Sequence, residues 1–177
     1  MPRKLLNAEL NRLTPQAYVH APKLPIVLVL DNIRSQHNIG AAFRTADAFC
    51  IEQICLCGIC AVPPSAEIHK AALGAEDTVA WRYFSETVEA VQRLHQEGYT
   101  LLIMEQVEEA YRLDQFVPQK GTKYALVFGN EVRGVQQEVV DLGDGSIEIP
   151  QFGVKHSLNV SVSIGVVLWD FWVKLSR

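Results

Sequence analysis

The sequence lacks an apolar run long enough to cross a bilayer, and it has no recognisable secretory signal. The last apolar stretch reaches Asp170 before it attains the roughly 20 apolar residues that a membrane helix needs. The first residues, MPRKLLNAELNRL, contain neither the uninterrupted apolar core nor the cleavage site of a signal peptide. We therefore expect a cytoplasmic protein that has no membrane partner.

Cysteine is scarce outside one short segment, which holds all four cysteines: Cys50, Cys55, Cys57 and Cys60. A zinc ribbon needs a second, distant pair of ligands, and this sequence has none. The segment also has the pattern of a strand, on which Cys55 and Cys57 share one face. We expect reduced, buried thiols that pack as small apolar side chains, and we expect no metal site.

The chain also lacks an excess of positive charge. It has 16 Lys and Arg against 20 Asp and Glu, a net charge of −4, whereas nucleic-acid-binding domains are usually basic. The charge is unevenly distributed, because four basic residues oppose Glu9 alone within residues 1–24, which gives this segment +3 and the rest −7. A polyanion would therefore be attracted by the N-terminal segment and by local patches.

What the sequence does contain is an alternation of apolar runs and amphipathic segments. Its 177 residues, 49% of them hydrophobic, suffice for one folded domain. The continuous apolar run over residues 25–31 is typical of a central parallel strand. These patterns predict an α/β fold with a mostly parallel sheet flanked by helices, in a domain of residues 25–177 that follows a short basic extension of residues 1–24. The predicted strands are 25–31, 51–57, 99–104, 124–128 and 146–149, and the predicted helices are 5–13, 39–49, 66–73, 86–97, 135–142 and 157–172.

The last of these helices is the least obvious. Its apolar residues alternate with a period of two, as in a strand, but its length is more than twice the 4–8 residues of most strands. We predict a helix capped by Ser157. Because it is apolar on several faces, we expect it to pack against a surface beyond its own sheet, such as a second subunit.

The first strand is followed by a helix whose outward face carries an arginine. Asn38 is expected to cap this helix, and Arg44 follows on the face where Gly40 and Ala41 leave room beside it. Ligands bind at the carboxyl edge of open α/β sheets, which makes Arg44 a candidate ligand contact. The alternative is an exposed helix arginine without a special role.

Two later strands are also followed by polar residues. Gly129 and Gly134 bracket Glu131 in a turn, where glycine allows the backbone to approach a ligand closely. Ser157 and Asn159 stand at the head of the last helix. No Gly-Lys-Ser or Gly-Lys-Thr is present after this turn and no GxGxxG follows the first strand, which disfavours a P-loop or a dinucleotide site. The alternative roles are a helix cap for Ser157, backbone contacts for Asn159 and a surface carboxylate for Glu131.

Three segments in this order, HNIGAAFRTADAF, LVFGNEVRGV and IEIPQFGVKHSLNVSVSIGVVLWDF, resemble the SpoU/TrmH family of SPOUT methyltransferases. IHKAALGAEDTVAW is similar to this family too, so the resemblance covers roughly residues 25–173. It implies that the domain transfers a methyl group from S-adenosyl-L-methionine to a ribose 2′-hydroxyl in tRNA or rRNA. It further implies a C-terminal trefoil knot, an exception to the rule that chains do not thread loops, and a homodimer.

The resemblance also assigns roles to individual residues. Arg44 corresponds to the catalytic arginine of the first motif, and Asn38, Glu131, Ser157 and Asn159 correspond to the other polar residues of the three motifs. The cofactor would lie in a cradle formed by strand ends and by the loop of the third motif, with these residues: Met104, Glu105, Gln106, Gly129, Ile149, Pro150 and Leu158.

Two positions depart from the family pattern. Arg133 stands where many members have glycine, and Gln151 stands where methionine is frequent; neither change removes a predicted catalytic group. The alternatives are a knotted RNA-binding protein without activity and a SPOUT enzyme that methylates a base, although the Ser-Leu-Asn of the third motif favours ribose. We expect tRNA rather than rRNA, because a short basic extension suits a compact substrate.

Overall fold

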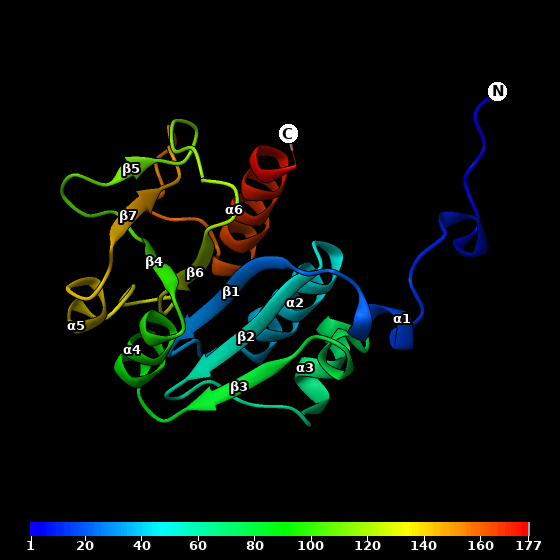
Figure 1. Cartoon of the computed structure of the whole chain (residues 1–177), viewed down its shortest axis with the longest axis horizontal. Coiled ribbons are helices and arrows are strands. Elements are labelled where there is room, and N and C mark those ends of the chain that lie inside the picture. Colours follow the sequence, from blue (N-terminus) through cyan, green and yellow to red (C-terminus); the bar gives the residue numbers. More distant parts are fainter. Residues whose placement is uncertain (177) are drawn as a thin grey trace.

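The computed structural model describes residues 1–176. Its centre is a seven-stranded sheet of order β3-β2-β1-β6-β4-β7-β5, in which all neighbouring strands are parallel (Figure 1). The predicted α/β fold with a parallel sheet is therefore confirmed. The strands are β1 (Leu24–Asp31), β2 (Ile51–Cys57), β3 (Trp81–Phe84), β4 (Tyr99–Met104), β5 (Tyr111–Arg112), β6 (Lys123–Phe128) and β7 (Gly145–Glu148).

Helices cover both faces of the sheet, with α2, α3 and α6 on one face and α4 and α5 on the other (Figure 1). The α-helices are α1 (Pro15–His20), α2 (Gln36–Ala48), α3 (Ala66–Ala72), α4 (Thr87–Gln96), α5 (Gln137–Val140) and α6 (Val160–Leu175). Two 3-10 helices complete the set, η1 (Asn7–Leu10) and η2 (Ala75–Asp77). In the part of the chain that the structure describes, no helix has the length and apolar character that a membrane crossing requires.

The continuous apolar run of β1 is explained by these two layers. Ile26, Leu28 and Leu30 belong to the apolar cluster under α2, α3 and α6, whereas Val27 and Val29 belong to the cluster under α4 and α5. Successive side chains of a strand point to opposite faces, so a strand with both faces covered must be apolar at every position.

The cysteines are buried and unpaired, as predicted, apart from the half-buried Cys50. Cys55 and Cys57 share the cluster under α4 and α5. Burial raises the pKa of Cys55 and of Cys60 to about 11, so both remain neutral thiols near pH 7 and behave as small apolar groups.

The helix predicted over residues 5–13 is wrong. Only η1 forms there, and Thr14 does not end a helix but caps α1, because its hydroxyl accepts a hydrogen bond from the Ala17 N–H at 3.2 Å. Pro15 occupies the first helical position, where its missing N–H has no cost. The buried Tyr18 anchors α1 in the core, while the segment before α1 extends away from the domain (Figure 1).

Two helices begin at a different cap from the one predicted. Ser35, rather than Asn38, caps α2, since its hydroxyl accepts from the Asn38 N–H at 3.2 Å. Asn159, rather than Ser157, caps α6, where its side-chain oxygen accepts from the Ser161 N–H at 2.9 Å. The helical prediction for the last apolar segment is confirmed. In both cases the sequence offers two good capping residues close together, and packing selects one.

The absence of a side chain at Gly40 serves helix packing instead of a ligand. A Cβ at this position would lie 2.5 Å from the Ile68 carbonyl oxygen and 2.8 Å from the Ala71 Cβ, both on α3. The prediction that Gly40 leaves room beside Arg44 is therefore wrong, because α3 fills that room.

The sequence patterns missed β3 and β5, the two edge strands. Each pairs with a single neighbour, β2 and β7 respectively, and each is short and partly exposed. A short, half-exposed edge strand carries neither a continuous apolar run nor a clear alternation.

Strand order alone does not establish the trefoil knot, which stays a prediction.

Candidate active site

A cavity of about 700 Å³ lies beyond the carboxyl ends of β4, β6 and β7. These ends lie side by side, because Met104 pairs with Phe128 of β6 and with Ile147 of β7. The volume is typical of a site for a small molecule, and the position at the carboxyl edge is where open α/β sheets bind ligands.

Most of the predicted site residues surround this cavity. Its lining includes these predicted cofactor-binding residues: Met104, Glu105, Gln106, Gly129, Ile149 and Leu158. Pro150 is not part of the lining. Three of the predicted catalytic residues, Glu131, Ser157 and Asn159, also line it, whereas Asn38 and Arg44 do not.

The turn after β6 is closed by its own backbone. The Asn130 N–H donates to the Gly134 carbonyl at 3.0 Å, and the Gly134 N–H donates to the Asn130 carbonyl at 2.9 Å. A Cβ at Gly129 would lie only 2.1 Å from the Val135 nitrogen and from the Gly134 carbonyl carbon. Gly134 has a φ of +68°, in the left-handed region that favours glycine. The need for Gly129 thus comes from backbone packing within the turn.

Glu105 and Gln106 hold the surrounding loops together. The Glu105 carboxylate accepts from the Gln106 N–H at 2.9 Å and from the Val135 N–H at 3.1 Å. The Gln106 side-chain amide donates to the His156 carbonyl at 2.9 Å. These contacts join the loops that follow β4, β6 and β7, so three walls of the cavity are fixed relative to one another.

Glu131 connects the turn after β6 to the start of α2. Its carboxylate accepts from the Arg34 N–H at 3.0 Å, from the Ser35 N–H at 3.1 Å and from the Asn38 side-chain amide at 3.1 Å. Burial raises the pKa of Glu131, but these donors and its own backbone N–H outweigh that effect, so the pKa is lowered overall. Glu131 is therefore ionised at neutral pH, and its negative charge faces the positive end of a helix.

Arg44 lies farther along the same helix. It is exposed, and its position six residues after Asn38 places it about 9 Å along the helix axis. Within residues 1–176, no hydrogen bond or ion pair engages its guanidinium. An exposed guanidinium of this kind can pair with a phosphate group, and in this structure it is not the partner of Glu131.

The loop before α6 forms the outer rim. Ser157, Leu158 and Asn159 are exposed there. The Asn159 side-chain oxygen accepts from both the N–H and the hydroxyl of Ser161, at 2.9 Å and 2.6 Å, so its amide nitrogen is left for other contacts. Ser157 and Asn159 both line the cavity and are within reach of a ligand that enters it.

The sequence reasoning missed Asp31, a fully buried carboxylate at the end of β1. It accepts from the Thr87 hydroxyl at 2.6 Å, and from the Gln136 side-chain amide and backbone N–H at 2.8 Å and 2.9 Å. It thereby ties β1 to the starts of α4 and α5, directly behind the turn that carries Glu131. The sequence feature that could have identified Asp31 is its position, as a charged residue at the end of a continuous apolar strand.

Comparison with known proteins gives a consistent family. The model described as the SpoU rRNA Methylase family matches residues 25–169. The chain is 31% identical over 144 residues to the 23S rRNA (guanosine-2′-O-)-methyltransferase RlmB of Neisseria meningitidis, with 81% of this chain and 56% of that protein covered. It is also 31% identical over 148 residues to the tRNA (guanosine(18)-2′-O)-methyltransferase of Thermus thermophilus, with 82% and 73% covered.

A solved structure shares the fold. The TrmH/SpoU tRNA modifying enzyme of A. aeolicus superposes with a TM-score of 0.79 at 23% identity, over 90% of this chain and 80% of that one. The chain spans little more than half the length of the Neisseria relative.

Proposed function

Because this chain belongs to the SpoU rRNA methylase family, we propose that it transfers a methyl group from S-adenosyl-L-methionine to a ribose 2′-hydroxyl of RNA in the cytoplasm. The observation that carries the proposal is the cavity at the ends of β4, β6 and β7, connected through Glu131 to the helix that bears Arg44. Relatives named for both 23S rRNA and tRNA support an RNA substrate.

The cavity residues fit this cofactor. S-adenosyl-L-methionine supplies a methyl group that is already activated on a positively charged sulfonium. Met104, Ile147 and Leu158 offer apolar surface for a flat adenine ring, and the carboxylates of Glu105 and Glu148 offset positive charge. The volume of about 700 Å³ is sufficient for a molecule of this size.

The task of the protein is then to make a neutral hydroxyl nucleophilic and to hold it in line. A guanidinium does not readily lose a proton in proteins, so we assign Arg44 to the phosphate beside the target ribose. Its positive charge lowers the effective pKa of the hydroxyl by favouring the alkoxide-like oxygen. Asn38 and Glu131 fix α2 against the cavity, and Ser157 and Asn159 orient the ribose at the rim.

The substrate class is tested by methylation of separated RNA pools. Purified protein, labelled S-adenosyl-L-methionine and either tRNA or rRNA should give label in tRNA, at a nucleotide whose adjacent phosphodiester resists alkali. Label at an alkali-sensitive position would indicate base methylation. Absence of transfer to both pools would indicate an RNA-binding protein without activity.

The basic extension is proposed to hold RNA by charge. Deletion of residues 1–13 removes Arg3, Lys4 and Arg12 but keeps α1, which the buried Tyr18 anchors. Arg3 is already paired with Glu9 at 2.6 Å, so the loss should amount to about one or two phosphate contacts. Each contact contributes roughly 0.7–0.9 to the slope of log K against log salt. RNA binding measured at a series of salt concentrations should be weaker for the truncated protein and should show a slope that is shallower by about one or two such contributions. An unchanged slope would refute the role of the extension.

The exposed face of α6 is proposed to bind a second copy of the chain. Trp169 and Trp172, which are 56% and 40% exposed, stack with ring centroids 5.4 Å apart. The ring centroid of Phe49, the residue after α2, lies 6.3 Å and 6.5 Å from those of the two tryptophans. Val162 and Val166 extend the apolar face along α6. An apolar surface of this kind on a folded domain marks an interface, and a homodimer would cover it.

Substitution of Trp169 by lysine should therefore disrupt the dimer. The change places a charge in the centre of the apolar face, and buried interface positions are depleted in charge. Light scattering coupled to size exclusion should give a dimer for the wild type and a monomer for Trp169→Lys. Val19→Lys, an equally exposed apolar position on α1, is the control and should stay dimeric. A dimeric Trp169→Lys variant would place the interface elsewhere.

A further inference from the structure

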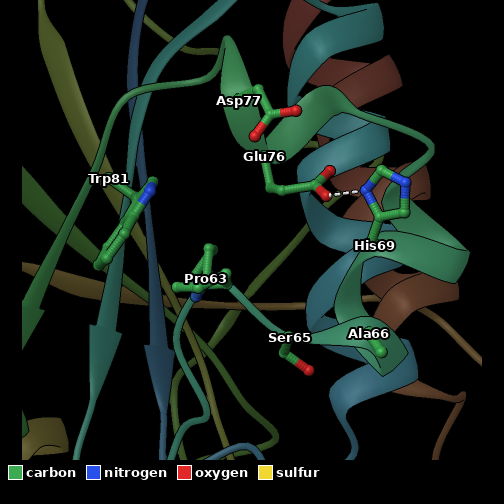
Figure 2. Close-up of a pocket in the computed structure, with 8 residues that line it drawn as sticks. Pro63, Ser65, Ala66, His69, Glu76, Asp77 and Trp81 are labelled. Carbon is green, nitrogen blue, oxygen red and sulfur yellow. Dashed lines mark hydrogen bonds and ion pairs between the residues drawn. The ribbon is translucent and has the colours of Figure 1, made fainter.

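A second cavity, of about 580 Å³, lies between α3 and the edge strand β3. It shares no lining residue with the active-site cavity. Figure 2 shows Trp81 on one side, Pro63 below, and His69 and Glu76 on the other side. Neither the family resemblance nor the proposed methyl transfer assigns it a role.

Glu76 is the unusual group of this cavity. The residue is only 8% exposed, and one carboxylate oxygen contacts the His69 Nδ1 at 2.5 Å. The other oxygen, Oε2, is buried and has no hydrogen-bond partner among the described residues. A buried carboxylate oxygen without a donor is unfavourable, so this wall of the cavity is short of one N–H or O–H group.

The protonation state of the pair follows from its surroundings. Burial raises the pKa of Glu76, but its own backbone N–H and the His69 ring outweigh that effect, so the pKa is lowered overall. Glu76 is therefore ionised at neutral pH and can only accept hydrogen bonds. It follows that the His69 Nδ1 carries the proton of their shared hydrogen bond, and that Oε2, which has no hydrogen-bond partner among the described residues, can accept one more hydrogen bond.

We propose that this cavity binds an unpaired purine base of the RNA substrate, with the base against the indole of Trp81 and an N–H group of the base donated to Glu76. The inference rests on the proposed function, since it assumes that RNA is the substrate. Bases stack readily on aromatic side chains, and the large ring system of a purine covers more of an indole than a pyrimidine does. The exocyclic amino group of adenine, or the amino group and the N1–H of guanine, can supply the donor.

Charge and geometry disfavour two other occupants. Glu76 and Asp77 both line the cavity, so a phosphate group would meet like charge there and stay outside. An arginine side chain of a protein partner would be attracted, but a guanidinium pairs best with two carboxylate oxygens at once. One oxygen of Glu76 is already engaged with His69, which favours a single N–H donor of a base.

The cavity is coupled to the active site through the start of α2. The Ser65 hydroxyl, at the cap of α3, donates to the Gln36 side-chain oxygen at 2.5 Å. Gln36 is the first residue of α2, two positions before the Asn38 that contacts Glu131. A base held against α3 would therefore be connected, through the Ser65–Gln36 hydrogen bond, to the helix α2 that bears Arg44. This would let the enzyme select RNA by a nucleotide other than the methylated one.

The test is a titration of the full chain with mononucleotides, followed by the indole N–H signals of its three tryptophans in nitrogen–proton NMR spectra. Trp81→Phe assigns the Trp81 signal. GMP or AMP should shift this signal and leave that of Trp169 unchanged, whereas ribose 5-phosphate should have no effect and UMP should bind several-fold more weakly, because its single ring covers less of the indole.

Variants of opposite walls identify the contacts. Glu76→Gln and Trp81→Ala should each weaken purine binding at least about tenfold, an effect typical of losing one stacking or charged hydrogen-bond contact. Tyr83→Ala is the matched control, since it removes an exposed aromatic of the same strand that does not line the cavity. Should Glu76→Gln fail to fold, Trp81→Ala and the mononucleotide shifts decide the question.

Three outcomes overturn the proposal. They are no shift of the Trp81 signal with any purine nucleotide, purine binding by Glu76→Gln and Trp81→Ala that equals binding by the wild type, or tighter binding of arginine amide than of GMP and AMP. The last outcome would indicate a site for a cationic protein side chain. Methyl transfer by the wild type is measured in parallel. Its absence, with purine binding intact, would contradict the proposed function and leave the cavity assignment standing.

Discussion

Replacement of Arg44 by alanine is expected to lower the rate of methyl transfer by a factor of about 10²–10³ or more, the usual effect of removing one charge-stabilising group. S-adenosyl-L-methionine binding should stay near the wild-type value, because Arg44 does not line the cavity assigned to the cofactor. The fold should also be kept, since the side chain is exposed and no partner holds it in residues 1–176. The result would separate positioning of the RNA from binding of the methyl donor.

The measurements are single-turnover methyl transfer with saturating RNA, calorimetric titration with S-adenosyl-L-methionine, and thermal unfolding. Arg93→Ala is a suitable control, because Arg93 is also an exposed helix arginine and, among residues 1–176, its only ion pair is with Glu97 of the same helix end. It lies on α4, on the opposite face of the sheet. Full single-turnover activity of Arg44→Ala would refute the assignment. A shallower RNA salt dependence in the same variant would support the phosphate contact.

Replacement of Gly129 by alanine is expected to abolish cofactor binding. The new Cβ would lie 2.1 Å from backbone atoms of the Gly134–Val135 peptide, and backbone cannot move aside as a flexible side chain can. The turn must open, which breaks the paired hydrogen bonds between Asn130 and Gly134 and displaces Glu131 from the start of α2. We expect at least a hundredfold loss of S-adenosyl-L-methionine affinity and a loss of stability of about 2–4 kcal/mol, as is found when strained or overpacked positions are created.

Gly153→Ala provides the matched control. Gly153 lies in the loop before α6, its φ is outside the left-handed region, and an added Cβ would meet nothing within 4 Å. This variant should bind the cofactor and unfold like the wild type. Near-normal cofactor affinity in Gly129→Ala would show that the turn tolerates rearrangement, and it would remove the turn from the binding site.

Several features of the fold were predictable because their signals are local. The run over residues 25–30 is apolar at every position, as a doubly covered strand must be, and β1 lies inside the sheet between β2 and β6. The length of the last apolar segment outweighed its period of two, and α6 is a helix. The glycines around Glu131 indicated a special turn, although the closeness of backbone to backbone explains Gly129 better than contact with a ligand does.

Other features depend on contacts that no short stretch of sequence contains. Both Ser35 and Asn38 can cap a helix, and only the packed structure shows that Ser35 does so while Asn38 turns to Glu131. The sequence also left open whether Gly40 faces a ligand or another helix, and in the structure it packs against α3. The edge strands β3 and β5 exist because a neighbouring strand offers free backbone groups, and their own sequences are too short to signal this.

The sequence by itself thus determined which residues are available for chemistry and which elements carry them, because caps, glycine turns and doubly buried strands follow from short-range sterics and hydrogen bonding. The tertiary structure decided which of these residues meet. It joined Glu131 to the Arg34 N–H across 97 positions of chain and kept Arg44 out of the cavity lining. It also buried, between α3 and β3, a Glu76 oxygen that has no hydrogen-bond partner in the part of the chain that the structure describes. The physical reason is that such contacts depend on the order and register of the strands, and these are settled by burial of the whole core rather than by any single segment.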